Sequence, residues 1–203
     1  MAKSTGQYMD PSVSRTKFDR EIAEYRVLEA DYRARGWFLV KAEWPVVIVV
    51  LASDKTKPPP IVAAVQFEYT NCDAEPPSVR FIDPFSGRVL TFKELPTRLP
   101  QGVPGQELAS PIPGGPMVQV MVAQDLMQAN SPEDVPFLCI AGVKEYHDHP
   151  GHSGDPWELH RSSGGGRLVR LLEVISKYGL ETVNGFNVNL QPHVSLAFSE
   201  PPQ

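Results

Sequence analysis

The sequence has little cysteine, no long hydrophobic run and no excess of positive charge. Two cysteines in 203 residues exclude a disulfide framework and lead us to expect a reducing, cytoplasmic environment. No apolar run approaches the roughly 20 residues of a membrane-spanning helix, and the first residues lack the apolar region of a secretory signal. The formal net charge of -5 gives no overall basic surface for nucleic acid. We therefore expect a globular protein that binds neither membrane nor nucleic acid.

Proline, by contrast, is abundant: the chain has 21 prolines, about twice the average usage. The prolines cluster, and together with glycine they dominate residues 96–116, where large apolar residues are few. A chain of 203 residues that is 41% hydrophobic suits one domain with a substantial core. We expect a single domain over residues 1–203, in which 96–116 is a surface insertion rather than an interdomain linker.

The first predicted element is an amphipathic helix over residues 11–35. Asp10 is a suitable N-cap, and Pro11 fits the first helical position. An apolar stripe then recurs at helical spacing between charged faces. The stripe consists of Phe18, Ile22, Tyr25, Leu28 and Tyr32. Gly36 stands where a left-handed residue commonly ends a helix.

Four apolar, partly β-branched runs follow the helix and predict an antiparallel meander. They cover residues 37–41, 46–51, 61–69 and 78–82. Beyond them, 88–92 suggests a short strand, 116–127 fits either a helix or a strand, and 180–198 suggests a short helix or strand. A helix is expected over 167–178, and its buried side consists of Leu168, Leu171, Leu172 and Ile175. The predicted fold class is α+β.

The residues with the most chemical potential lie between Cys139 and His160. Four of the five histidines fall in this window, namely His147, His149, His152 and His160. A cysteine with several histidines suits either a thiolate nucleophile with acid–base helpers or a metal site. In the first case Cys139 is the nucleophile and His147 and His149 transfer protons, because their ordinary pKa suits neutral pH. Asp148 would orient an imidazole or accept a proton.

Other interpretations of this window remain open. Cys139 follows an apolar run and fits a buried core position equally well. The histidines of a loop rich in glycine and proline can instead cap backbone groups. Zinc is the third alternative, because Cys139, Glu145, His147 and His149 are acceptable ligands in number and type. Paired short spacings are missing, however, and the last three residues would share a face only on a regular strand.

Two further segments carry weaker signals. Cys72 lies in a proline-rich loop, which favours an incidental surface cysteine over a nucleophile. Three glycines, Gly164 to Gly166, precede the predicted last helix and hint at a phosphate-binding loop. Without a preceding strand and a Lys-Ser/Thr pair, we interpret them as a flexible hinge.

The order of elements resembles that of the ubiquitin-conjugating enzymes. In both, an amphipathic helix and a four-strand meander are followed by a cysteine, a tryptophan and a later helix, and a tyrosine and a proline pair flank the loop before the fourth strand. Here that loop carries Tyr69, Pro76 and Pro77 and leads into the run Val79-Arg80-Phe81. The pattern Cys139…Glu145-x-His147-x-His149 resembles a bacterial group encoded beside ubiquitin-like proteins, activating enzymes and metalloprotease deconjugases. Part of that group is described as a predicted metal-binding domain.

The resemblance implies a ubiquitin-conjugating-like fold in which Cys139 carries a ubiquitin-like protein as a thioester and passes it to an amine on a protein target. It implies the ubiquitin-like protein and an activating enzyme as partners, the latter meeting Arg15, Lys17 and Arg20 of the first helix. No cofactor is expected. The family's His-Pro-Asn motif is missing, and Asn130 stands near its expected place. The alternative is a non-catalytic interaction module in which zinc is bound by the same cysteine, glutamate and histidines.

Overall fold

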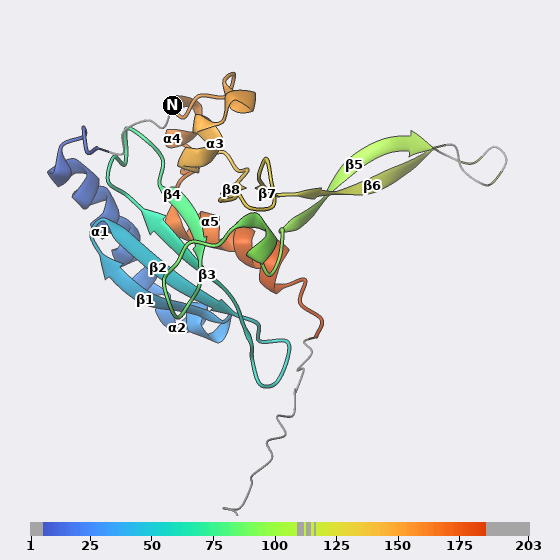
Figure 1. Ribbon diagram of the computed structural model, residues 1–203, viewed down its shortest axis with the longest axis horizontal. Helices are drawn as coiled ribbons and strands as arrows, with labels where there is room; N and C mark the ends of the chain where they lie inside the picture. The colour runs from blue at the N-terminus through green and yellow to red at the C-terminus, as the bar shows by residue number, and fades with distance from the viewer. Residues whose placement is uncertain (1–5, 109–111, 113–114, 116, 186–203) are drawn as a thin grey trace, which may run out of the picture.

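The computed structural model describes residues 6–108, 112, 115 and 117–185, which form an α+β arrangement (Figure 1). Two helices lead into a four-stranded sheet, a hairpin projects from the body, and short helices precede the last helix. The predicted N-terminal helix, antiparallel meander and C-terminal helix are confirmed. No helix in these residues is both long and apolar enough to cross a membrane. Most of the element predicted over 180–198 lies outside the described residues.

Helix α1 (Pro11–Val27) begins as its sequence predicts. The Asp10 side chain accepts a hydrogen bond from the Ser12 N–H at 2.8 Å, and proline occupies the first turn. The Ser12 hydroxyl donates to the same carboxylate, and the two hydrogen bonds from Ser12 hold the pKa of the Asp10 carboxyl below its usual value. Phe18 and Tyr25 are buried against the sheet core. The predicted start of α1 and the burial of these two residues of its apolar stripe are therefore confirmed.

The predicted single helix over 11–35 is wrong at Leu28, where the chain breaks before α2 (Glu29–Ala34). Leu28 has φ -113° and ψ 18°, which is not helical, and it is 46% exposed instead of buried. Beyond the break, the Tyr32 ring lies 4.8 Å from Tyr25 and stacks on Trp37 at 5.1 Å between centroids. The interruption leaves Leu28 exposed, and the three aromatic rings form a cluster where α2 meets the first strand.

The sheet is an antiparallel meander of β1 (Trp37–Glu43), β2 (Val46–Ala52), β3 (Ile61–Glu68) and β4 (Ser78–Ile82), in that order. One row of paired residues crosses all four strands and is buried throughout: Leu39, Val49, Val65 and Phe81. Burying each such side chain stabilises the fold by about 1.5–3 kcal/mol. This row forms the centre of the core that supports the site.

Helix α5 (Leu168–Ile175) packs on the same core. Its predicted buried side is confirmed, because Leu168, Leu171, Leu172 and Ile175 are at most 1% exposed. Its first amide is satisfied by the buried Glu21 of α1, whose carboxylate accepts a hydrogen bond from the Leu168 N–H at 3.0 Å. The chain continues as the wider helical turn η3 (Ser176–Leu180), so helical structure extends two residues beyond the predicted end at 178.

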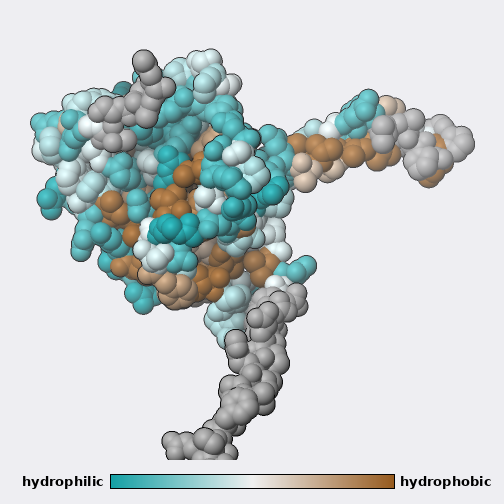
Figure 2. All heavy atoms as spheres, viewed as in Figure 1, coloured by the Kyte–Doolittle hydropathy of each residue, from teal (hydrophilic) through white to brown (hydrophobic). Residues whose placement is uncertain are grey.

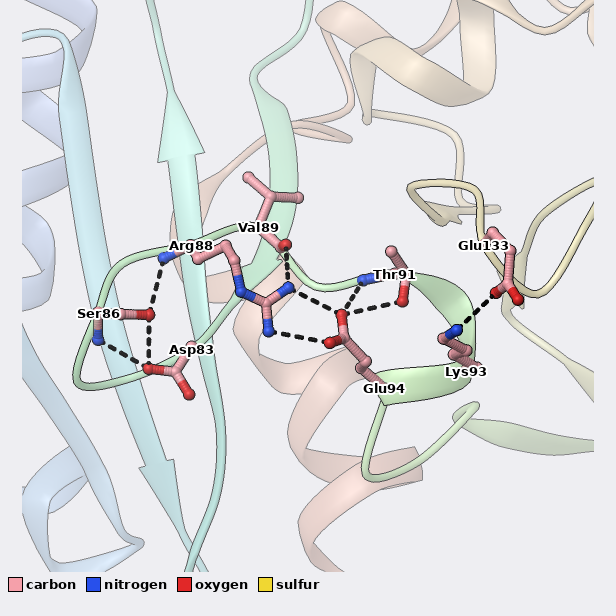
Figure 3. Close-up of polar contacts among 8 residues, drawn as sticks. All are labelled: Asp83, Ser86, Arg88, Val89, Thr91, Lys93, Glu94 and Glu133. Atoms are coloured by element: carbon pink, nitrogen blue, oxygen red, sulfur yellow. Dashed lines mark hydrogen bonds and ion pairs between the residues drawn. The ribbon is translucent and has the colours of Figure 1, made fainter.

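A compact turn follows β4 (Figure 3). The Asp83 carboxylate accepts hydrogen bonds from the Ser86 N–H at 2.7 Å and from its hydroxyl at 2.9 Å. Arg88 then binds both oxygens of Glu94 at 2.9 Å, and Glu94 also accepts the Thr91 N–H at 2.8 Å. These side chains satisfy the backbone locally, so the chain turns instead of extending the sheet.

The strand predicted over 88–92 is therefore wrong. The bridge between Val89 and Ile82 is the one β pairing of this segment within the described chain. The short helix η1 (Phe92–Glu94) replaces the remainder, because the Thr91–Glu94 pair forms a capping box around its first turn.

The predicted insertion contributes one strand of a hairpin. β5 (Pro100–Leu108) pairs antiparallel with β6 (Val118–Asp125), so the ambiguous segment 116–127 is a strand over most of its length. The hairpin projects from the body, and hydrophobic residues run along it (Figures 1 and 2). Met117 and Met121 are 59% and 60% exposed. Valine, a β-branched residue that favours strands, occupies every second position at the start of β6, which explains why this segment is not helical.

Candidate functional site

A short strand pair sets the position of Cys139. β7 (Met127–Gln128) and β8 (Phe137–Leu138) are antiparallel, with Met127 opposite Leu138, and both side chains are buried. The Cys139 N–H donates to the Leu126 carbonyl at 2.7 Å, and the chain then leaves the pair in a turn. The thiol is consequently partly exposed at the edge of the core.

His152 is the imidazole in contact with this thiol. Cys139 Sγ and His152 Nε2 are 3.5 Å apart, close enough for a proton to pass between them. His152 ends the short helix η2 (Pro150–His152), and its ring stacks on Tyr146 with centroids 4.0 Å apart. Partial burial raises the pKa of the Cys139 thiol. The resting pair is thus a neutral thiol beside an imidazole.

Asp155 organises the groups behind that pair. One carboxylate oxygen accepts a hydrogen bond from the Tyr146 hydroxyl at 2.7 Å, and the other contacts His160 Nε2 at 2.5 Å. The hydrogen bond from His160, the larger cause, and that from Tyr146 lower the pKa of Asp155. Burial and the same carboxylate raise the pKa of Tyr146 to about 12, so its hydroxyl stays protonated. This chain fixes the ring on which His152 stacks.

His147 has both ring nitrogens occupied by backbone groups. Nε2 accepts a hydrogen bond from the Gly142 N–H at 3.2 Å, and Nδ1 lies 2.8 Å from the Asp155 carbonyl oxygen. Since an amide only donates and a carbonyl only accepts, Nδ1 carries the proton and the imidazole is neutral. His147 therefore joins the turn after Cys139 to the Asp155 loop, a positioning role in place of the predicted proton transfer.

The glycines that follow are packed tightly. Gly142 has φ +107°, and a Cβ there would lie 2.2 Å from the Gly165 carbonyl oxygen. A Cβ on Gly166 would lie 2.8 Å from Pro77 and 3.2 Å from Trp157. Gly165 and Gly166 therefore pack directly over the turn after Cys139 and leave little room for a side chain, so the segment predicted as a flexible hinge at 164–166 is closely packed there.

Glu145 lies on helix α3 (Lys144–Asp148), not on the regular strand that would align it with the histidines. Its carboxylate accepts hydrogen bonds from the Ser78 hydroxyl and, at 3.1 Å, from the Val79 N–H, and pairs with Arg80 at 3.0 Å. The side chain is 12% exposed. Glu145 thus anchors α3 to the start of β4.

Asp148 and His149 face other partners than the thiol. Asp148 forms an ion pair with Lys144 at 3.0 Å on the exposed side of α3. His149 stacks on Phe137 with centroids 4.9 Å apart, and its Nδ1 accepts the Gly151 N–H at 3.2 Å, which caps η2. Both residues border the site, and these contacts join them to partners other than Cys139.

The four residues of the zinc alternative are directed to different partners. The oxygens of Glu145 serve β4 and both nitrogens of His147 serve the backbone, so neither presents a lone pair to a common point. Across the described ranges, no three His, Cys, Asp or Glu side chains come together as a metal-binding group. This geometry does not fit a tetrahedral site.

Cys72 is buried, contrary to the surface position expected from its loop. It is 9% exposed, and burial, the larger cause, together with the Asp73 charge raises the pKa of its thiol to about 12. The loop folds back over α1 and the sheet core, so a proline-rich sequence here forms a packed flap. Cys139 remains the accessible thiol of the two.

The structure places His152 beside Cys139, where the sequence led us to expect His147 and His149. His152 was in the predicted window without a role, and Tyr146 and Asp155 were given none. Spacing signals none of these roles, because α3, η2 and the turn before α4 (Glu158–Arg161) reverse the chain within a few residues. The one sequence signal for this arrangement was the position of Asp155 close to several histidines.

Fold and site together define an α+β protein with a partly exposed Cys–His pair beside a four-stranded meander. The Y4jH-like family model, described as the Y4jH family, matches residues 9–183. A protein of Sinorhizobium fredii (strain NBRC 101917 / NGR234), described as "Uncharacterized protein y4jH", is 44% identical over 196 residues, which covers 91% of each chain. The chain belongs to the Y4jH family. Neither description names an activity.

Replacing Glu145 with glutamine is expected to destabilise the fold independently of metal. The change removes a charged acceptor that binds Val79 and Arg80, and hydrogen bonds to charged groups contribute about 1.5–3 kcal/mol each. Urea unfolding should show a loss of about 2 kcal/mol with and without a chelator. Glu133→Gln, which breaks an exposed pair with Lys93, is the control and should unfold like the parent. An effect that chelation of the parent reproduces would instead identify a metal ligand.

The two thiols are expected to differ in alkylation by iodoacetamide. Cys139 should react in the native protein, at a rate that keeps rising above pH 9 because burial raises the pKa of its thiol and the thiolate is the nucleophile. Cys72 should react only after unfolding. Mass spectrometry of the labelled peptides measures both rates. Faster labelling of Cys72, or a Cys139 rate that levels off below pH 8, would contradict the described environments.

Proposed function

We propose that this protein is a conjugating enzyme that carries a ubiquitin-like protein as a thioester on Cys139 and passes it to an amine on a protein target. The observation that carries the proposal is the contact of a partly exposed thiol with an imidazole, 3.5 Å apart, on a segment that leaves the sheet edge. The helix and four-strand meander around it agree with the ubiquitin-conjugating-like architecture that the sequence resembles.

Loading is a transfer between two thiols. The Cys139 sulfur attacks the thioester carbonyl on the activating enzyme while His152 Nε2 takes the thiol proton. The C–S bond to Cys139 forms, the C–S bond to the activating enzyme breaks, and the cysteine of the activating enzyme leaves as a thiolate that regains a proton. Because the bonds broken and formed are alike, the exchange is nearly balanced and a weakly acidic thiol suffices. The raised pKa of Cys139 agrees with such a step, since His152 supplies the base at the moment of attack.

Discharge to an amine needs the same base. A target ammonium gives one proton to solvent, and its nitrogen attacks the thioester carbonyl. The C–N bond forms, the C–S bond breaks, and His152 transfers the second nitrogen proton to the leaving sulfur of Cys139. Within the described residues, the Ala141 N–H donates to no acceptor, so it can hydrogen-bond the oxyanion two residues from the sulfur. Asn130 is exposed.

The surface for the activating enzyme is proposed on α1. Of the three basic positions expected there, Arg15 is exposed, with its guanidinium 3.8 Å from Asp19. Lys17 and Arg20 instead line a cavity beside the helix. We therefore assign the encounter surface to the side of α1 that carries Arg15, where charge mainly affects association rate and salt sensitivity.

The proposal is tested by incubating the protein with ATP, an activating enzyme and a ubiquitin-like protein from the same genome. A covalent adduct should appear on a non-reducing gel and disappear when a thiol reductant is added, and added lysine should consume it. An adduct that survives reduction and hydroxylamine would be an amide and would contradict a thioester on Cys139. The zinc-binding module is not favoured, because Glu145 and His147 are committed to other groups.

A further inference from the structure

A polar cavity of about 470 Å³ lies beside α1, separate from the Cys139 pair. Its walls come from α1, from the flap between β3 and β4, and from the segment that joins Trp157 to α5. The glycine run that sequence alone left as a weak phosphate-loop signal borders it through Gly164 and Gly166. A volume of this order is typical of sites for small molecules.

Four cationic side chains line the cavity with only three carboxylates, although the whole chain carries a net charge of -5. The cations are Lys17, Arg20, Arg161 and Arg167, and the carboxylates are Glu21, Glu24 and Asp73. This wall therefore has one positive charge in excess, and anions are attracted to it more than to the rest of the surface.

The arginine heads are incompletely used by the protein. Arg161 lies 3.8 Å from Asp73. Arg167 donates one hydrogen bond to Glu24, and its Nε lies 3.9 Å from Glu21. Each arginine side chain is 50% exposed. Within the described chain, the Arg161 guanidinium makes no hydrogen bond. Glu21 is already engaged by the first amide of α5. Planar N–H donors thus remain for an incoming acceptor with two or more oxygens.

Tyr69 gives an independent indication of a ligand. It lines the cavity and is 1% exposed, yet its hydroxyl has no hydrogen-bond partner among the described residues. Phe18 packs edge-on against its ring at 5.8 Å between centroids. Tyr69 shares the cavity wall with Glu21 and Cys72. A buried hydroxyl without a partner costs about 1–3 kcal/mol unless something else accepts its proton.

We propose that this cavity binds a small phosphate-bearing molecule of about mononucleotide size. Arg161 and Arg167 bind the phosphate oxygens, the Tyr69 hydroxyl donates to the ligand, and the wall formed by Trp157 and Pro77 contacts its less polar part. Phosphate fits better than a single carboxylate, because it is a dianion with enough oxygens for two arginines and the tyrosine. The site does not depend on the chemistry of Cys139.

The test is isothermal titration calorimetry with adenosine 5′-monophosphate, inorganic phosphate and adenosine at fixed ionic strength. The monophosphate and inorganic phosphate should bind at one site and compete, whereas adenosine should not bind. Arg161→Gln should weaken both at least roughly 10-fold because it removes a charged, bidentate donor. Arg26→Gln is the matched control, since Arg26 pairs with Glu29 away from the cavity and should leave binding unchanged.

Tyr69→Phe separates a ligand contact from a structural one. The hydroxyl has no protein partner, so the ligand-free variant should melt at or above the parent temperature while its affinity for the monophosphate falls several-fold. Absence of saturable binding of either phosphate probe would overturn the proposal. It would also be overturned by parental affinity in Arg161→Gln, or by binding of a single-stranded oligonucleotide without binding of the monophosphate.

Discussion

Cys139→Ala is expected to form no reductant-sensitive adduct with the ubiquitin-like protein, whereas the parent is loaded. The thiol is the partly exposed one of the two and lies 3.5 Å from His152, so its removal takes away both the bond-forming atom and the proton donor of the pair. The loss should be complete within the detection limit of a non-reducing gel. Cys139 is at the edge of the core, and circular dichroism should show a parental fold.

Two variants serve as controls for this result. Cys139→Ser should give either a more stable oxyester, resistant to a thiol reductant and cleaved by alkali, or no adduct. Cys72→Ala should load like the parent, although loss of a buried side chain lowers its melting temperature. Alanine is preferable to serine at position 72, because serine would bury a hydroxyl. Parental loading of Cys139→Ala would remove the nucleophile assignment.

His152→Gln is expected to slow loading by about 100-fold at pH 7, the lower end of what a positioned general base contributes. Glutamine keeps the size of the side chain but cannot accept the thiol proton. The difference from the parent should narrow as pH rises past 9, because burial raises the pKa of the Cys139 thiol and only above that pKa does the thiolate form without a base. Single-turnover loading measured across pH gives both curves.

His149→Gln is the matched control for this second result. His149 lies in the same loop but stacks on Phe137, and its Nδ1 accepts a backbone amide instead of contacting the sulfur. Its loading rate should stay within a few-fold of the parent at every pH. A pH-independent defect in His152→Gln, or an equal defect in both variants, would show that the loop has only a structural role.

The helix and sheet could be predicted because their signals are local and agree with one another. Asp10 and Pro11 start α1 by capping chemistry, and the β-branched run of β2 allows little besides a buried strand. The break at Leu28 could not be predicted from periodicity, because the apolar spacing continues through it to Tyr32, which stacks on Trp37. The strand expected over 88–92 also fails, because Arg88 and Thr91 both bind Glu94 and the short helix η1 forms there.

The site was predicted less completely, because its partners are set by tertiary contacts. The pattern of Glu145 and His147 indicated shared chemistry, yet the two point to opposite neighbours, β4 and the Asp155 loop. Alternation in sequence places residues on one face only in a strand, and α3 is a helix. Cys72 shows the same limit, since a proline-rich segment can be a packed flap as readily as a surface loop.

The most direct measurement is peptide mapping of the parent protein after loading. The protein is incubated with ATP, the activating enzyme and the ubiquitin-like protein, digested at mildly acidic pH without reductant, and analysed by tandem mass spectrometry. We predict that the C-terminal residues of the modifier are attached to the peptide that contains Cys139, and that hydroxylamine removes them. Attachment to Cys72, to a lysine alone, or to no residue of this chain would contradict the account.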